Sequence, residues 1–103
     1  MFTGIVQGTA RVAQLSDRAG LRCIRLEFAP GFAEGLVAGA SVSVDGTCLT
    51  VTAVHAGHAA DFDVMQQTLA LTTMGALVPG SRVNVERAAK DGAEIGGHPL
   101  SGH

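Results

Sequence analysis

The chain of 103 residues contains no tryptophan and no tyrosine, and it has only four phenylalanines and two cysteines. It lacks an apolar run of about 18 residues, the length of a membrane-spanning helix, and its first residues lack the basic and apolar regions of a signal peptide. The seven basic residues are scattered from Arg11 to Lys90 without a run or a helical stripe, and the net charge is −2. These absences argue against secretion, membrane insertion and electrostatic binding of nucleic acid. They predict a cytoplasmic protein in which Cys23 and Cys48 stay reduced.

Hydrophobic residues, by contrast, are abundant. They make up 47% of the chain, charged residues make up only 16%, and the mean hydropathy is +0.31. Such a composition excludes intrinsic disorder, which requires low hydrophobicity and high net charge. A chain of this length forms one domain with a core of its own. The 14 glycines follow no collagen-like period and therefore indicate turns.

Apolar and polar residues alternate with a period of two along much of the chain, which predicts half-buried strands. Asp45-Gly46 separates two such segments and is typical of a two-residue hairpin turn. Gly8 predicts a bulge or bend within the first segment. Short helical connectors are expected over residues 33–36 and 68–74. The six expected strands, typical of a small antiparallel barrel or sandwich, cover residues 5–12, 24–28, 41–44, 47–54, 60–64 and 83–86.

Cys48 is the first candidate for chemistry. A cysteine in a strand of β-branched residues is usually a small core side chain. The alternation, however, places Cys48 on one strand face with Thr50 and Thr52, opposite Leu49 and Val51. A face that carries a thiol and two hydroxyls suits the wall of a polar pocket better than a dry core.

The C-terminal tail is the second candidate, because it is rich in glycine and carries His98 and His103. A zinc site is not expected there, since no further ligands follow at close spacing. The glycines beside the histidines allow the backbone to approach a small molecule closely. A solvated chain end fits these residues equally well.

Asp61 and Asp63 share a face of their expected strand and raise the question of acid–base chemistry. Carboxylates two residues apart on an exposed sheet face are usually solvated, and this is the expectation here. The chain has no glycine-rich phosphate loop, no G-x-S-x-G and no C-x-x-C. The residues by themselves therefore predict a small β-barrel with a polar pocket and leave its function open.

Several blocks of the sequence resemble riboflavin synthase and stand in the order and spacing of that family. They are residues 1–6 (MFTGIV), 39–52 (GASVSVDGTCLTVT), 83–88 (VNVERA), 96–98 (GGH) and 101–103 (SGH). The chain is identified as a member of this family that matches its N-terminal lumazine-binding barrel. The resemblance implies one barrel over residues 1–103, with residues 96–103 as the start of a linker to a second barrel.

The resemblance also implies a fold and a reaction. The fold is a six-stranded antiparallel Greek-key barrel with one or two short connecting helices. The full enzyme carries two such barrels, forms a homotrimer, and moves a four-carbon unit between two molecules of 6,7-dimethyl-8-ribityllumazine. Its products are riboflavin and a ribitylaminopyrimidinedione, and no metal or redox cofactor takes part. A single barrel is expected to bind the pteridine or flavin but to be weakly active or inactive.

The site residues follow from the same resemblance. Residues near the reacting carbons are Phe2, Ser41, Cys48 and His103, where an imidazole suits proton transfer and a thiol or hydroxyl suits addition to a ring carbon. The substrate-binding residues are Gly4, Ile5, Val6, Cys48, Leu49, Thr50, Asp63, Val64, Met65, Gln66, Gln67, Thr68, Gly102 and His103.

Three functions remain open for such a barrel. It is a part of the enzyme, a non-catalytic lumazine or flavin binder of the antenna type, or a barrel used only for assembly. The expected partner is a second barrel or a second copy of the chain, and a homodimer is the simplest closed assembly of the isolated domain.

Overall fold

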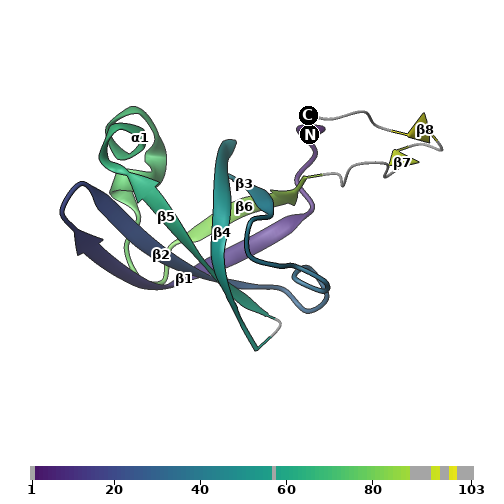
Figure 1. Ribbon diagram of the computed structural model, residues 1–103, viewed down its shortest axis with the longest axis horizontal. Coiled ribbons are helices and arrows are strands. Elements are labelled where there is room, and N and C mark those ends of the chain that lie inside the picture. The colour runs from purple at the N-terminus through teal and green to yellow at the C-terminus, as the bar shows by residue number, and fades with distance from the viewer. Residues whose placement is uncertain (1, 57, 89–93, 96–97, 100–103) are drawn as a thin grey trace.

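Six strands close into an antiparallel barrel in the order β1-β2-β5-β4-β3-β6 (Figure 1). The computed structural model describes residues 2–56 and 58–88, together with the backbone of residues 94–95 and 98–99. The barrel strands are β1 (Gly8–Arg18), β2 (Leu21–Phe28), β3 (Ser41–Val44), β4 (Thr47–His55), β5 (Ala59–Met65) and β6 (Arg82–Arg87). Between β5 and β6 lie the helix α1 (Gln66–Leu71) and the 3-10 helix η1 (Thr73–Ala76).

The strand order is a Greek key. Strands β3, β4 and β5 follow one another as antiparallel neighbours, and β6 returns across the barrel to pair with β3. Closure of the barrel gives each of the six strands a paired neighbour on both sides. The predicted six-stranded antiparallel Greek-key barrel with short connecting helices is confirmed.

The core consists of the inward-facing residues of all six strands, as the alternation of apolar residues predicts. Phe62 lies at its centre, fully buried, with its ring edge against Phe28 at a centroid distance of 6.4 Å. Met74 of η1 is also fully buried and joins the core from the connection between β5 and β6. The largest fully buried side chains are Phe62, Ile24, Leu26, Met74, Val12, Val42, Val44, Val51, Val64, Val83 and Val85.

The predicted hairpin turn at Asp45-Gly46 is confirmed. Asp45 has a φ of 47° and Gly46 a φ of 83°, and two successive positive φ values match the tight turn whose twist suits a β-hairpin. The Asp45 carboxylate also accepts a hydrogen bond from the backbone N–H of Asn84 at 2.7 Å. This bond ties the hairpin to β6.

The prediction for the first strand is wrong at both ends. β1 begins at Gly8 instead of residue 5, runs on to Arg18, and has its bulge between Val12 and Gln14 instead of at Gly8. The early part stays outside the sheet because the side-chain oxygen of Gln7 accepts the Arg87 N–H at 2.8 Å. A side chain here takes the place of a backbone acceptor, so the ladder between β1 and β6 stops.

The helical connectors also differ from expectation. Residues 33–36 form turns, because Gly31, Gly35 and Gly39 have φ values of 87°, 73° and 92°, which are incompatible with a right-handed helix. The connector expected over residues 68–74 is present but divided into α1 and η1. The division falls at Thr72, whose extended backbone interrupts the helix and whose hydroxyl donates to the Thr68 carbonyl at 2.7 Å.

In the C-terminal tail, β7 (Glu94–Ile95) pairs with β8 (His98–Pro99) as a separate two-stranded sheet. Of the expected linker over residues 96–103, residues 96–97 and 100–103 lie outside the described residues, and these include the predicted site residues Gly102 and His103. No helix in the described part of the chain is long and apolar enough to cross a membrane.

Candidate functional site

A polar face covers the outside of the barrel over β6, β3 and β4. Ser43 of β3 lies opposite Glu86 of β6 on one side and opposite Cys48 of β4 on the other, and Ser41 lies opposite Thr50. Opposed residues of antiparallel strands project to the same side, with Cβ atoms about 4.5–5.5 Å apart. Cys48 and Thr50 are exposed. The predicted placement of Cys48 on the strand face opposite the buried Leu49 and Val51 is therefore confirmed, and its role in a pocket stays a prediction.

Residues 3–6, here named the N-terminal arm, are held at this face by Glu86. The Glu86 carboxylate accepts hydrogen bonds from the Thr3 N–H at 2.5 Å, the Thr3 hydroxyl at 2.8 Å and the Gly4 N–H at 3.0 Å. The side chains of Ile5 and Val6 are 67% and 54% exposed. The arm thus brings two solvent-exposed apolar side chains to a face otherwise lined by polar groups.

Glu86 itself is only 5% exposed. Burial by itself raises the pKa of the Glu86 carboxyl, but the hydrogen bonds from Thr3 and Gly4 outweigh it and leave the pKa below its usual range. The group is therefore ionised at neutral pH. Sequence reasoning did not assign Glu86 a role, because its place in the alternation matches that of an ordinary solvent-facing residue.

Next to Cys48, the barrel wall splits between β4 and β5. The two strands pair from His55↔Ala59 to Val51↔Phe62, and the described ladder ends there. Residues 47–50 of β4 continue in pairing with β3, while residues 63–65 of β5 continue in pairing with β2. Figure 1 shows the start of β4 and the end of β5 pointing apart, with α1 at the tip of β5. Each strand therefore presents one edge whose backbone groups are not used by the other strand.

Six of the fourteen predicted substrate-binding residues flank this split. On the β4 side, Cys48 and Thr50 point outward, while Leu49 is only 5% exposed and belongs to the core. On the β5 side, Asp63 and Met65 point outward, while Val64 is 1% exposed. The buried side chains fix the two strands in place. Contacts between a ligand and Leu49 or Val64 would use their backbone groups.

The remaining predicted residues of this segment lie on α1. The backbone N–H of Gln66 donates to the Gly20 carbonyl at 2.9 Å, which fixes the start of the helix against the β1–β2 turn. Gln66 and Gln67 are exposed and Thr68 is half-buried. At the other end of the predicted site, Phe2 is half-buried. The structure thus brings Ser41, Cys48 and the arm to one face but leaves the place of His103 undescribed.

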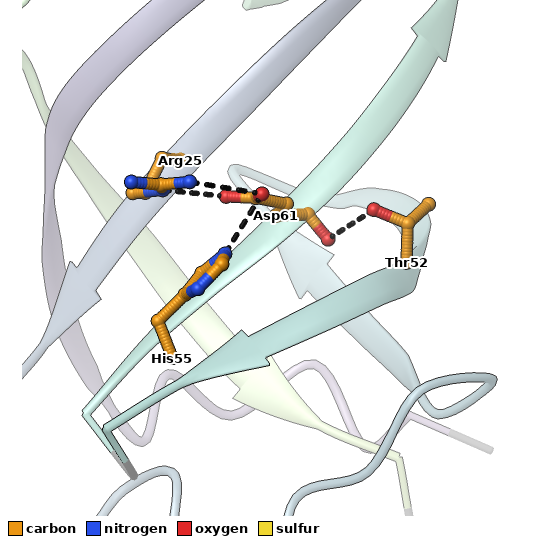
Figure 2. A network of polar contacts seen from close by, with 4 residues as sticks. All are labelled: Arg25, Thr52, His55 and Asp61. Atoms are coloured by element: carbon orange, nitrogen blue, oxygen red, sulfur yellow. Dashed lines mark hydrogen bonds and ion pairs between the residues drawn. The ribbon is translucent and has the colours of Figure 1, made fainter.

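Asp61 is not solvated as expected. It bridges Arg25 and His55, accepting from Arg25 Nε at 2.8 Å and lying 2.9 Å from His55 Nε2 (Figure 2). The Thr52 hydroxyl donates to its backbone carbonyl at 3.2 Å. Arg25 and His55 come from β2 and β4, the strands on either side of β5. The expectation failed because pairing across strands, which the local pattern does not show, brings the charges together.

We expect Asp61→Asn to lower the free energy of unfolding by about 1 kcal/mol at pH 7, because the half-exposed Arg25 lets water screen part of the interaction. The hydrogen bond from Arg25, aided by His55, lowers the pKa of Asp61 in the folded protein. The stabilisation is therefore complete above the unfolded pKa of about 3.9 and disappears as the pH falls through the lower folded value.

Urea denaturation of wild type and Asp61→Asn between pH 3 and 7 measures this difference. Asp63→Asn, an exposed carboxylate on the same strand, serves as the matched control. A stability difference for Asp61→Asn that stays constant down to pH 3 would contradict the ionic explanation.

Two hollows formed by described residues are lined mainly by residues of β1 and β2. One of about 190 Å³ is lined by Gln14, Ser16, Arg18, Cys23, Arg25 and Asp61, and one of about 270 Å³ lies beside Gln66 and Leu69. Burial and the carboxylates of Asp61 and Asp63 raise the pKa of the Cys23 thiol. Cys23 therefore stays protonated at neutral pH and is a poor nucleophile. Within residues 2–56 and 58–88, no group of three His, Cys, Asp or Glu side chains is arranged to hold a metal ion.

The sequence of this barrel matches the family model described as "Lumazine binding domain" over residues 3–88, which spans all six barrel strands. The chain belongs to the lumazine-binding domain family. The match begins within the arm and ends just after β6. It therefore includes both the clamped N-terminal segment and the split between β4 and β5.

Proteins named riboflavin synthase are similar to the chain along its whole length. The enzyme of Escherichia coli (strain K12) is 48% identical over 103 residues, and that of Mycobacterium tuberculosis (strain CDC 1551 / Oshkosh) is 43% identical over 106 residues. All of this chain is covered in both comparisons, but only 48% and 51% of the enzymes. This lumazine-binding domain thus spans about half the length of these relatives and corresponds to their N-terminal half.

Solved structures of LumP share the fold. LumP complexed with 6,7-dimethyl-8-(1'-D-ribityl) lumazine superposes with a TM-score of 0.78 at 31% identity, covering 93% of this chain and 52% of LumP. LumP complexed with riboflavin superposes with a TM-score of 0.77 at 29% identity, covering 93% and 54%. These relatives bind their ligands with a chain that is again about twice as long.

Proposed function

We propose that the chain is the N-terminal lumazine-binding half of a riboflavin synthase and that it binds 6,7-dimethyl-8-ribityllumazine and riboflavin at the split between β4 and β5. The observation that carries this proposal is the pair of unused strand edges beside Cys48 and Thr50. The identity to riboflavin synthases and the ligands of the LumP structures supply the chemical class of the ligand.

The chemistry of the ligand matches the groups at the split. A pteridine carries hydrogen-bond donors and acceptors along the edge of a flat ring, as a strand does along its edge, so residues 47–50 offer complementary backbone groups. The ribityl chain carries hydroxyls, which suit the outward polar side chains of Asp63, Gln66 and Gln67. The exposed Ile5 and Val6 of the arm offer apolar contact to a ring face.

The reaction gives the remaining residues their proposed roles. One lumazine loses a proton from its C7 methyl group, whose carbanion is delocalised into the ring, and the other accepts a nucleophile at C7. The Cys48 thiol and the Ser41 hydroxyl lie on the polar face where such an addition is made, and His103 is proposed for proton transfer. Phe2 is proposed to contact the ring near the reacting carbons.

The proposed unit of function is larger than this barrel. Residues 1–103 are proposed to form one barrel, with residues 96–103 leading toward a second one. The partner is that second barrel or, for the isolated domain, a second copy in a homodimer, and the full enzyme is proposed to be a homotrimer. A non-catalytic role like that of an antenna protein is the alternative, supported by the structural similarity to LumP.

Titration of riboflavin with the protein tests the binding. The fluorescence of riboflavin itself reports the binding. We expect the fluorescence to be quenched on binding, and Thr50→Val to weaken the affinity about 2–10-fold through loss of one hydrogen bond. Thr9→Val is the matched control, since this exposed threonine lies on β1, three strands away from β4. Absence of quenching at high protein concentration would refute the binding proposal.

A further inference from the structure

We propose that Glu86 is a positioning residue of the ligand site, acting through the N-terminal arm, an inference that rests on the proposed function. The residue lies on β6, and the arm that it holds lies more than 80 positions earlier in the chain. Of the buried residues in the described part of the chain, Glu86 is the only one with a polar or charged side chain. Burying a carboxylate is costly unless its oxygens are hydrogen-bonded, and here the arm supplies the donors.

The arm depends on this carboxylate because little else holds it. It precedes β1 and lies outside the barrel ladder, and its side chains at positions 5 and 6 are exposed. Gly4 has a φ of 82°, a conformation that only glycine adopts at little cost, so the chain turns sharply where Glu86 binds it. Without the carboxylate, the backbone N–H groups of Thr3 and Gly4 would lose their acceptor.

Through the Thr3 hydroxyl, Glu86 also positions the backbone of Ile5. The Thr3 hydroxyl donates its proton to Glu86, which leaves its oxygen free to accept the Ile5 N–H at 3.2 Å. An ionised carboxylate fixes this direction because it only accepts hydrogen bonds. Glu86 therefore sets the backbone course of the arm up to its first apolar side chain.

The position of Glu86 on the barrel connects the clamped N-terminal arm to the ligand site. In the cross-strand register, Ser43 separates Glu86 from Cys48, so the carboxylate stands in the same row as the thiol beside the split. The row crosses three neighbouring strands, each about 4.8 Å from the next. An arm clamped at one end of this row lies within reach of a flat ligand bound at the other end.

The central experiment compares wild type with Glu86→Gln. The amide has nearly the same size but only one acceptor oxygen, and its NH₂ group faces the donors of Thr3 and Gly4. We expect riboflavin affinity to fall about 10-fold, and hydrogen exchange at the Thr3 and Gly4 amides to become at least about 10-fold faster while exchange in the core strands stays unchanged. Glu34→Gln, the same change at an exposed site, is expected to alter neither measurement.

A double-mutant cycle separates positioning from a general structural role. Thr3→Ala removes the hydroxyl from the arm and leaves the barrel core untouched, so it also tests the clamp if Glu86→Gln does not fold. If Glu86 acts through the arm, the double variant binds riboflavin no more weakly than Glu86→Gln alone.

The proposal would be overturned if the losses of riboflavin affinity from Glu86→Gln and Thr3→Ala multiplied in the double variant. It would also be overturned if hydrogen exchange at the Thr3 and Gly4 amides were unchanged in Glu86→Gln. Failure of the wild type to bind riboflavin would instead refute the proposed ligand. The exchange measurement would then still decide whether Glu86 holds the arm.

Discussion

Phe62→Ala is expected to lower the free energy of unfolding by about 3–5 kcal/mol, the usual cost of emptying a buried phenylalanine site. Phe62 is fully buried, pairs across strands with Val51 and Ile24, and meets the ring of Phe28 edge-on. The closed barrel holds these neighbours in place and prevents them from collapsing into the vacated space. A domain of this size has a total stability of only about 5–15 kcal/mol, so the variant retains a small margin.

The measurement is urea denaturation followed by circular dichroism, since the chain has no tryptophan or tyrosine to report by fluorescence. Phe32→Ala is the control. Phe32 is half-buried in the β2–β3 connection and stacks on Phe28 at 4.8 Å, so its removal should cost less than half as much. Equal losses for the two variants would show that the core is not centred on Phe62.

With lumazine as the only substrate, we expect the 103-residue chain to form riboflavin at least about 1,000-fold more slowly than the same barrel extended by a second one. The reaction joins two molecules, and holding both in a reactive arrangement is worth effective molarities of about 10⁵–10⁸ M. The described residues form one split between β4 and β5, at which one ring is proposed to bind. The chain is therefore expected to bind lumazine with little turnover.

Flavin absorbance during incubation with lumazine measures this rate. The control is a chimaera in which the C-terminal half of the Escherichia coli relative follows residue 103, because that enzyme is 48% identical to the present chain over its length. Flavin formation by the single barrel at the rate of the chimaera would contradict the expectation. A chimaera that binds lumazine yet forms no flavin would favour the antenna-type function.

The same flavin-absorbance assay shows how much of the rate comes from holding two rings together and how much from the side chains of Cys48 and His103. If holding two rings face to face supplies most of the rate, Cys48→Ala and His103→Ala in the extended chain slow the reaction without abolishing it. Complete loss of turnover in either variant, with lumazine binding intact, would show that the side chain and not the arrangement dominates.

Features that depend on neighbouring residues were accessible from the sequence. The alternation over residues 41–44 and 47–54, with Asp45-Gly46 between them, predicts the β3–β4 hairpin and the placement of Cys48 on the face opposite Leu49, and the structure confirms both. Side-chain direction in a strand follows from parity alone, so no knowledge of the partner strand is needed. The same rule identifies Phe62 and Val64 as core residues.

Features that depend on pairing between distant segments could not be predicted from the sequence. The clamp between Glu86 and the arm, and the bridge from Asp61 to Arg25 and His55, join residues whose local patterns match ordinary solvent-facing positions. The β1–β6 ladder likewise stops before Gln7 because the Gln7 side chain accepts a hydrogen bond from the Arg87 N–H of β6. In each case the partner is chosen by barrel closure and strand register.

The sequence by itself thus determined three features: the all-β barrel, the position of the β3–β4 turn at Asp45-Gly46, and the face of β4 that carries the Cys48 thiol. Tertiary structure alone decided that β4 and β5 part beside Cys48 and that Glu86 is a buried anchor instead of a surface charge. The physical reason is that local patterns encode which side of a strand a residue faces. Which residues stand opposite one another, and where a ladder ends, is settled only when all six strands pair around one core.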